Sequence, residues 1–191
     1  KFLKENKCII YIGESSFMNT DCFFKQAGIT ALAKKYAYKG RPTIFEQENL
    51  IKIHDKTAKI LKDFEIAKIL KEVDYIIDMP KMKTHILVDY TGGIKNLYGV
   101  IPGGMKQKLH NKATGEKNFS QLLVDIYQNI KPQLTIMDAV IGMEGHGPAS
   151  GIPKKAGLII ASKNTVALDI CASKIMNFNP KRIFVDIKPI Y

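Results

Sequence analysis

The sequence has little arginine, because only two of its 29 basic residues, Arg41 and Arg182, are of that type. Arginine supplies the bidentate contacts that read base edges and hold phosphates in most nucleic-acid interfaces. No helix-turn-helix, zinc finger or aromatic-rich RNA-binding strand is visible either. The formal net charge of +11 therefore comes mainly from lysine. Nucleic-acid binding ranks third among the functions considered, after small-molecule binding and protein binding.

Cysteine is also sparse, with three residues (Cys8, Cys22 and Cys171) and no Cys-x-x-Cys pair. Neither an iron–sulfur cluster nor a zinc knuckle can be built from this chain alone. We expect buried free thiols, as in a reducing compartment, and hence a cytoplasmic protein. No metal site is predicted, because the histidines and Glu144 lack a compact ligand spacing.

Long apolar runs are absent as well. No run approaches the roughly 18 residues that a membrane span needs, and no charged-then-apolar signal segment opens the chain. The length of 191 residues, 46% of them hydrophobic, predicts a single domain over residues 1–191. The chain opens at Lys1 and enters an apolar strand almost at once, so we expect it to be truncated at its N-terminus.

The order of apolar segments predicts an α/β fold. Continuous apolar runs indicate buried strands at residues 7–12, 74–79, 134–141 and 158–161. A 3.6-residue period predicts helices at residues 21–36, 118–130 and 164–176, with Asn118 and Asn164 as N-caps. Residues 50–61 indicate an antiparallel hairpin. Together these elements predict three layers, with a mainly parallel sheet flanked by helices on both faces.

Three polar, glycine-bearing loops are expected after strands, at residues 13–16, 80–115 and 142–157. The middle one carries six lysines against a single acid, Asp89. Ligands of parallel sheets bind beyond the carboxyl ends of the strands. If the strands are parallel, the three loops meet at one edge of the sheet and form one composite site for an anion.

Basic and glycine residues of these loops are the candidate ligand-binding residues. Lys81, Lys83 and His85 alternate along an extended segment and therefore point the same way. Glycines at 92 and 93 allow backbone N–H groups to approach an anion closely, and a short helix opening there would attract negative charge. The full set is Lys81, Lys83, Thr84, Thr91, Gly92, Gly93, Lys95, Asn96, Lys106, His110, Gly13, Glu14 and Ser15.

Four residues are candidates for acid–base catalysis: His85, Glu144, His146 and Asp138. Asp138 lies within an apolar strand, so we expect it to be buried and paired with a loop lysine or histidine, in a role that is either structural or catalytic. We expect Asp169, the one acid of an apolar helix, to cap or to form a salt bridge, and His54 to be exposed at a turn.

Several spaced motifs carry a family resemblance. They lie at residues 13–15, 79–85, 93–103, 134–148 and 161–169. Across residues 9–177 the sequence resembles the domain of unknown function family 362 (DUF362). Members of that family are often joined to ferredoxin-like modules with two iron–sulfur clusters, so the resemblance implies a redox setting supplied by a neighbouring domain or partner. The family's usual opening Lys-Pro-Asn segment is absent here.

The leading hypothesis is therefore an α/β protein that binds an anionic small metabolite or cofactor of unknown identity in a lysine- and glycine-rich cleft. It would act as an enzyme or as the substrate-binding half of an iron–sulfur-linked redox enzyme. The alternative is a non-catalytic module whose basic face docks an acidic protein such as a ferredoxin. No membrane association is expected.

Overall fold

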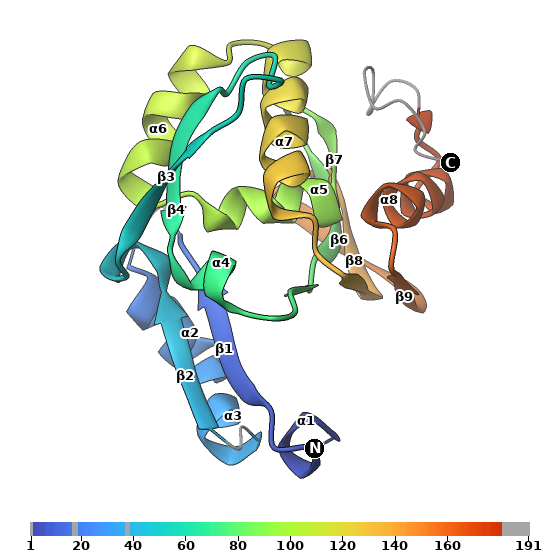
Figure 1. The fold of residues 1–191 in the computed structure, drawn as a ribbon. Coiled ribbons are helices and arrows are strands. Elements are labelled where there is room, and N and C mark those ends of the chain that lie inside the picture. Colours follow the sequence, from blue (N-terminus) through green and yellow to red (C-terminus); the bar gives the residue numbers. More distant parts are fainter. Residues whose placement is uncertain (1, 17–18, 37–38, 181–191) are drawn as a thin grey trace. The chain divides into compact units, whose positions relative to one another are not determined.

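The structure, a computed structural model, describes residues 2–16, 19–36 and 39–180. Helices and strands alternate along the chain, which confirms the α/β class (Figure 1). The residues form two compact units. The first holds Lys1–Ile53, Phe64–Glu72 and Gly99–Leu109, and the second holds His54–Asp63, Val73–Tyr98 and His110–Tyr191.

The first unit contains a parallel strand pair joined by two helices. After α1 (Phe2–Glu5), β1 (Ile9–Glu14) pairs in parallel with β2 (Lys39–Ile44). The connection holds α2 (Thr20–Gln26) and α3 (Ile29–Tyr36), and α3 packs on both strands. One helix was predicted over residues 21–36, but Gly28, at φ +71°, separates two. Such a φ suits glycine because it has no Cβ.

The predicted hairpin at residues 50–61 is right in kind but wrong in its second strand. After a 3-10 turn (Phe45–Gln47), β3 (Leu50–His54) pairs with β4 (Asp63–Ala67), which leads to α4 (Ile69–Glu72). Hydrogen bonds to a distant side chain hold the segment between the two strands. The carboxylate of the buried Asp125 accepts the backbone N–H groups of Ile60 and Leu61, both at 2.8 Å.

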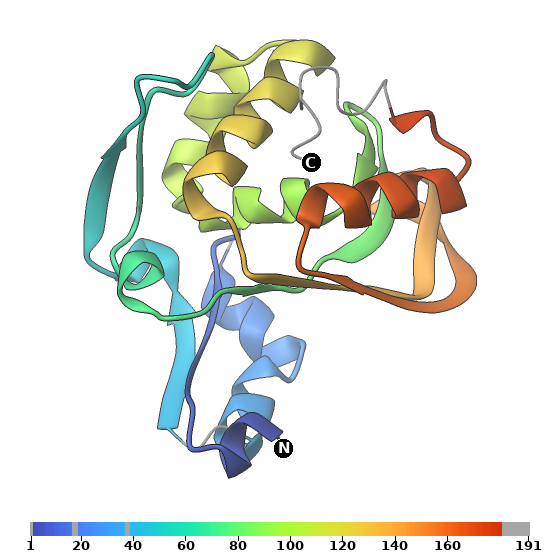
Figure 2. The same cartoon turned by 45° about the vertical axis from the view of Figure 1, so that its right-hand side comes forward.

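The second unit is built on a five-stranded mixed sheet with β8 (Leu134–His146) at its centre. Along one edge β8 pairs in parallel with β5 (Ile77–Asp78) and then with β6 (Lys81–His85). The pairings of β6 with β7 (Asp89–Thr91) and of β8 with β9 (Ser150–Ser162) are antiparallel. Figure 2 shows β8 and β9, in orange, together as a long curved ribbon.

Two segments that were predicted to be loops have regular structure. Residues 142–157 are not a loop, because β8 continues to His146 and β9 begins at Ser150, so that neighbouring strands satisfy the backbone groups. Glycine lets these strands lie close to others; for example, a Cβ at Gly142 would meet the Met82 carbonyl oxygen at 3.0 Å. The predicted loop 80–115 contains β6, β7, α5 (Gly93–Asn96), a 3-10 turn (Leu97–Val100) and α6 (Gly103–Lys112).

Two long helices complete the second unit, α7 (Glu116–Ile130) and α8 (Thr165–Ile175). Asn164 caps α8 as predicted, since its Oδ1 accepts the Ala167 N–H at 3.0 Å. The predicted cap at Asn118 is wrong: α7 begins at Glu116 after Gly115, and the Asn118 amide donates back to the Thr114 carbonyl instead.

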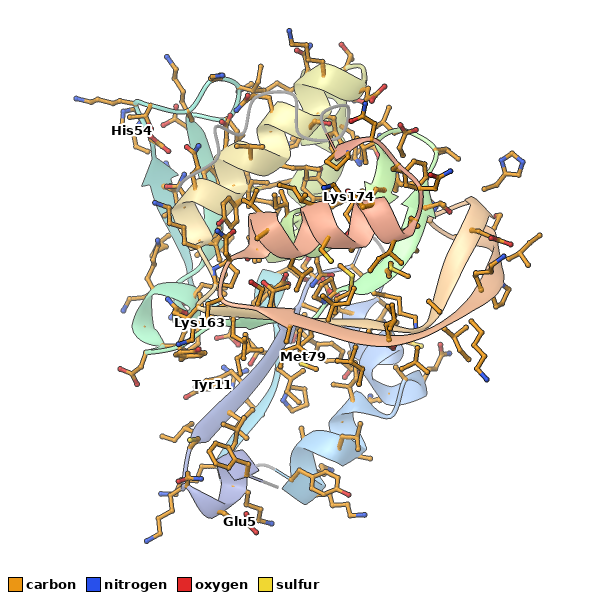
Figure 3. All side chains as sticks on the ribbon, turned by 90° about the vertical axis from the view of Figure 1, so that its right-hand side faces the viewer. Glu5, Tyr11, His54, Met79, Lys163 and Lys174 are labelled. Carbon is orange, nitrogen blue, oxygen red and sulfur yellow. The ribbon has the colours of Figure 1, made fainter. Side chains whose placement is uncertain are left out.

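Helix α8 packs against β8 and β9, as Figure 2 shows, and Lys163, labelled in Figure 3, lies between β9 and α8. The core beneath α8 contains buried side chains from three strands and from the helix: Met82, Tyr90, Met137, Ala139, Leu168 and Ala172. Burial on one side of β6 leaves the alternate residues Lys81, Lys83 and His85 on the other side of that strand.

The cysteine prediction was wrong in part. All three cysteines are free, but Cys22 and Cys171 are exposed and Cys8 is partly exposed. Cys22 and Cys171 lie on accessible sides of α2 and α8, and Cys8 directly precedes β1. Among the helices of the described residues, none has the length and apolar character to cross a membrane.

Candidate functional site

Burial separates three lysines from the rest. Among the lysines that the structure describes, Lys83 and Lys95 are half-buried, Lys106 is buried, and all the others are exposed. An ammonium group loses hydration when it is withdrawn from water, so a partly buried lysine needs compensation that an exposed one does not. All three were predicted to bind a ligand. Lys83 and Lys95 belong to the second unit, and Lys106 belongs to the first.

Two histidines accompany the two half-buried lysines of the second unit. Lys83 and His85 project from β6, Lys95 from α5 and His110 from α6. We refer to these four half-buried residues as the lysine–histidine cluster. The pKa of His85 is lowered to about 4, chiefly by burial and then, in decreasing order, by Lys95, His110 and Lys83. The structure thus brings together four residues that lie up to 27 positions apart in sequence.

The His85 ring has a defined hydrogen bond on one side. Its Nδ1 accepts the backbone N–H of Leu87 at 3.1 Å. The neutral ring therefore carries its proton on Nε2, which faces away from that turn. Asp89 lies opposite His85 in the antiparallel pairing of β6 with β7.

Aromatic rings hold His110. Its imidazole stacks on Phe119 with ring centroids 4.4 Å apart and meets Tyr98 edge-on at 5.6 Å. The Lys95 ammonium lies 6.0 Å from the centre of the same Phe119 ring. Burial lowers the pKa of His110, and the charge of Lys95 lowers it further. Phe119 thereby positions both a cation and a histidine.

The glycines of the predicted anion site already bind a carboxylate, which belongs to the protein. Asp169 of α8 is buried and accepts the N–H groups of Gly93 at 2.7 Å and Ile94 at 2.9 Å. The Tyr90 hydroxyl donates to the same carboxylate at 3.0 Å. Gly92 is tightly enclosed, since a Cβ there would overlap Tyr90 and Asp169. The short helix α5 does open on negative charge, as predicted, and Asp169 supplies that charge.

The remaining polar residues near α5 also make internal contacts. Asn96 donates from its amide to the buried Asp78 at 2.7 Å. The hydroxyls of Thr84 and Thr91 are buried and have no hydrogen-bond partner within the described residues. These two threonines lie on the adjacent strands β6 and β7 that carry His85 and Asp89.

The first unit gathers a separate set of candidate residues around Lys106. The buried Lys106 ammonium donates to the Ser15 carbonyl oxygen, and the Ser15 hydroxyl is itself buried without a partner in the described chain. Burial lowers the pKa of Lys106, while the carboxylates of Glu14 and Glu46 oppose this shift. Gly13 lies against the Phe45 ring. Since the described contacts of Lys106 are to this unit, it serves here as an internal cation between acids.

The expectation that Asp138 is buried was wrong. The residue pairs with Lys81 at 2.7 Å, as a loop lysine was expected to do, but the two side chains are 54% and 45% exposed. Asp138 lies on the face of β8 away from the α8 core, because its neighbours Met137 and Ala139 point into that core. The Lys81 ammonium and a backbone N–H lower the carboxyl pKa.

Glu144 and His146 lie at the exposed end of β8. Glu144 pairs with Lys154 of β9 at 3.1 Å, and His146 is opposite Ser150. The Gly147 carbonyl accepts the N–H of Ile86 at 3.1 Å, so the tip of the β8–β9 hairpin does reach the residue after His85. His54, labelled in Figure 3, is exposed and pairs with Asp63 at 2.7 Å, in agreement with expectation.

Sequence reasoning missed Phe119, Tyr98 and Asp125 and underestimated Asp169. Phe119 is one of the apolar positions of α7 and Tyr98 lies in the 3-10 turn before α6, and only the fold places them against His110. Within the described residues, no group of three or more His, Cys, Asp or Glu side chains is arranged to hold a metal ion.

The lysine–histidine cluster can donate several hydrogen bonds to one acceptor. Two of its donor groups are positively charged ammonium groups.

Comparison with known proteins establishes the family. The model of the domain of unknown function DUF362 matches residues 1–174, and the chain belongs to that family. A curated relative is the thylakoid-associated protein sll1697 of Synechocystis, 37% identical over 119 residues, which are 62% of this chain and 37% of that protein. This chain spans less than half of its length.

A crystal structure of a Thermotoga maritima protein shares the fold, with a TM-score of 0.55 and 15% sequence identity. The match covers 93% of this chain and 49% of that one.

Proposed function

We propose that the second unit binds an anionic small molecule, such as a phosphorylated or carboxylated metabolite or cofactor, at the lysine–histidine cluster. The observation that carries this proposal is the selective burial of Lys83 and Lys95 in a chain whose other described lysines, Lys106 excepted, are exposed. Lys83 and Lys95 would provide the charge, and the imidazoles of His85 and His110 would provide directed N–H donors.

Physical chemistry supports an anion as the ligand. Burial lowers the pKa of His85, and the charges of Lys95 and Lys83 contribute to the same shift, as expected where positive charges gather. An anion would relieve that repulsion, and hydrogen bonds from ammonium groups to an anionic oxygen are among the stronger ones in proteins. The backbone donors at Gly93 and Ile94 are engaged by Asp169 and are not counted in this site.

The test is a binding screen with matched charge controls. Phosphorylated and carboxylated metabolites are screened by thermal shift, and hits are measured by isothermal titration calorimetry. We expect Lys83→Ala and Lys95→Ala each to weaken binding by about 10- to 100-fold, the effect of a charge-assisted hydrogen bond worth about 1.5–3 kcal/mol. Lys108→Ala and Lys112→Ala, which remove the same charge from exposed positions on α6, should change affinity by less than about threefold.

The pattern of effects distinguishes the explanations. Melting temperatures of Lys83→Ala and Lys95→Ala should stay near that of the parent protein. If both variants unfold, the lysines are structural and the proposal fails. Equal losses in all four variants would mean that diffuse charge attracts the ligand and that no site exists at the cluster.

The second candidate is docking of an acidic protein partner, which the exposed lysines favour, including the adjacent Lys154 and Lys155 on β9. Such docking predicts an affinity that falls steeply with salt and is insensitive to Lys83→Ala. Titration with an acidic ferredoxin at low and physiological ionic strength measures it. We also propose, together with the anion site, a redox role beside an iron–sulfur module and a cytoplasmic location. Retention on a DNA column at physiological salt would favour nucleic-acid binding instead.

A further inference from the structure

A narrow cavity lies beside the lysine–histidine cluster. It is formed where α5 meets β7, α7 and α8, and all of its lining residues belong to the second unit. Its volume is about 20 Å³. A water-sized group needs about 10–15 Å³, so the cavity can hold one such group. Lys95 lines this cavity and is also a member of the cluster, which makes the two features adjacent.

The wall of the cavity is largely apolar, whereas its entrance is polar. The buried side chains of the wall are Val88, Tyr90, Ile94, Leu123 and Val124. Lys95 and Ser120 are the half-buried residues of the lining, so the entrance lies on their side. A group that enters therefore passes an ammonium and a hydroxyl group and leaves bulk water behind.

The carboxylate of the buried Asp169 also lines the cavity. Its Oδ1 accepts two hydrogen bonds, from Gly93 and Tyr90, whereas its Oδ2 accepts one from Ile94 in the described chain. An ionised carboxylate has about four acceptor positions, so Oδ2 can accept one more donor. Burial raises the pKa of Asp169 to about 6 although the three donors lower it, which means that its charge is incompletely stabilised.

Resting on the proposed function, we propose that the ligand carries a hydroxyl group next to its anionic group. The anionic group binds at the lysine–histidine cluster, and the hydroxyl group enters the cavity and donates to Oδ2 of Asp169. A small hydroxy acid, such as a 2-hydroxycarboxylate, has this arrangement. The donor is a hydroxyl and not an ammonium group, because the Lys95 ammonium lines the same cavity and repels a second cation.

The size and the chemistry of the cavity make this recognition selective. A hydroxyl group has one non-hydrogen atom and fits, whereas a longer branch exceeds the volume. A methyl group is similar in size but donates no hydrogen bond, so it separates the Asp169 carboxylate from water without compensation. A site that hydrogen-bonds a hydroxyl group strongly rejects the analogue that lacks it. Asp169 and Ser120 are therefore specificity-determining residues.

Two matched carboxylates test the proposal. Glycolate and propionate have the same charge and the same number of non-hydrogen atoms, and they differ in a hydroxyl against a methyl group. Their affinities are measured by nuclear magnetic resonance titration of the ¹⁵N-labelled chain at about pH 7.5, where both probes and Asp169 are ionised. We expect glycolate to bind about 10- to 100-fold more tightly, the effect of one hydrogen bond to a charged group.

Acetate and glycine complete the set of probes. Propionate and glycine should bind no more tightly than acetate, because the first lacks a donor and the second brings an ammonium group next to Lys95. Equal affinities for glycolate and propionate overturn the proposal, because the cavity then holds no ligand hydroxyl. Tighter binding of glycine than of glycolate overturns it as well.

Ser120→Leu tests the entrance without changing Asp169. A leucine there closes the cavity, so the ratio of glycolate to propionate affinity should fall to about one, since specificity is a difference of affinities. Sulfate has no hydroxyl group to place in the cavity, and its affinity should stay within about threefold of the parent value. Gln128→Leu makes a similar change at an exposed position of α7 and should keep the ratio.

Asp169→Asn is the second variant. Its amide nitrogen cannot accept a hydrogen bond, so the ratio should fall here too. If this variant does not fold, Ser120→Leu decides. A ratio that is unchanged in Ser120→Leu refutes the proposal.

Failure of the proposed function and failure of this inference look different. If sulfate, phosphate and the carboxylates all fail to bind the parent chain, the anion site itself is refuted. If sulfate binding depends on Lys83 and Lys95 while glycolate and propionate bind equally, the anion site stands and the hydroxyl recognition is refuted.

Discussion

The buried carboxylate of Asp169 should be the most sensitive single position in the second unit. It accepts the N–H groups of Gly93 and Ile94 and the hydroxyl of Tyr90, over 2.7–3.0 Å. Asp169→Ala leaves three buried donors without a partner, and each such donor costs about 1–3 kcal/mol. The backbone can relax in part, so we expect the variant to lose about 3–5 kcal/mol of unfolding free energy.

The substitution Asp169→Asn keeps the shape of the side chain and removes its charge. Oδ1 accepts two of the three donors and Oδ2 accepts the Ile94 N–H. The amide can keep its oxygen towards the pair of donors, but its NH₂ then faces the third. We expect a loss of about 1–3 kcal/mol, smaller than for alanine. Asp21→Asn is the control, because Asp21 forms only an exposed i,i+4 pair with Lys25, worth about 0.5 kcal/mol or less.

The same carboxyl should make stability depend on pH. Burial raises its pKa to about 6, above the value of about 3.9 expected for an unfolded chain. Between these values the folded state holds the proton more tightly, so the free energy of unfolding decreases as pH rises from about 4 to about 6 and then levels off. The shift of about 2 units corresponds to about 3 kcal/mol at most. Asp169→Asn should remove this component.

Urea unfolding followed by far-ultraviolet circular dichroism at pH 4.5, 5.5 and 7 measures all three effects. The slope of free energy against urea should be the same for all variants, which shows that the midpoint shift reflects stability. The reasoning is wrong if Asp169→Ala costs no more than the Asp21→Asn control. It is also wrong if the Asp169→Asn protein keeps the full pH dependence of the parent.

Three further outcomes are expected elsewhere. Asp125→Ala should cost about 2–4 kcal/mol, because buried backbone donors of the turn between β3 and β4 lose their acceptor, and limited proteolysis should then cut in that turn. Single and double alanine variants of Lys81 and Asp138 should give a coupling energy below about 1 kcal/mol in a double-mutant cycle, since both side chains are about half exposed. Asn164→Ala should lower stability by about 1 kcal/mol in thermal unfolding, because α8 loses its N-cap; no change would mean that packing alone fixes this helix end.

Local signals in the sequence were enough for some features. The cap at Asn164 and the end of α8 are encoded within a few positions of the sequence. The motifs that indicated the DUF362 family, and the excess of lysine over acid in residues 80–115, needed no coordinates. Alternating strands and helices were likewise enough to indicate an α/β protein.

Tertiary structure alone decided which of the lysines are half-buried beside histidines. In the sequence Lys81, Lys83 and Lys95 look alike, yet Lys81 is exposed and paired with Asp138, while the other two are half-buried near two histidines. Likewise the glycines at 92 and 93 suggested an anion from outside, and the anion is Asp169, 76 residues further along the chain from Gly93. Composition cannot reveal such pairings, because burial and the choice of hydrogen-bond partner depend on residues that become neighbours only when distant strands and helices pack together.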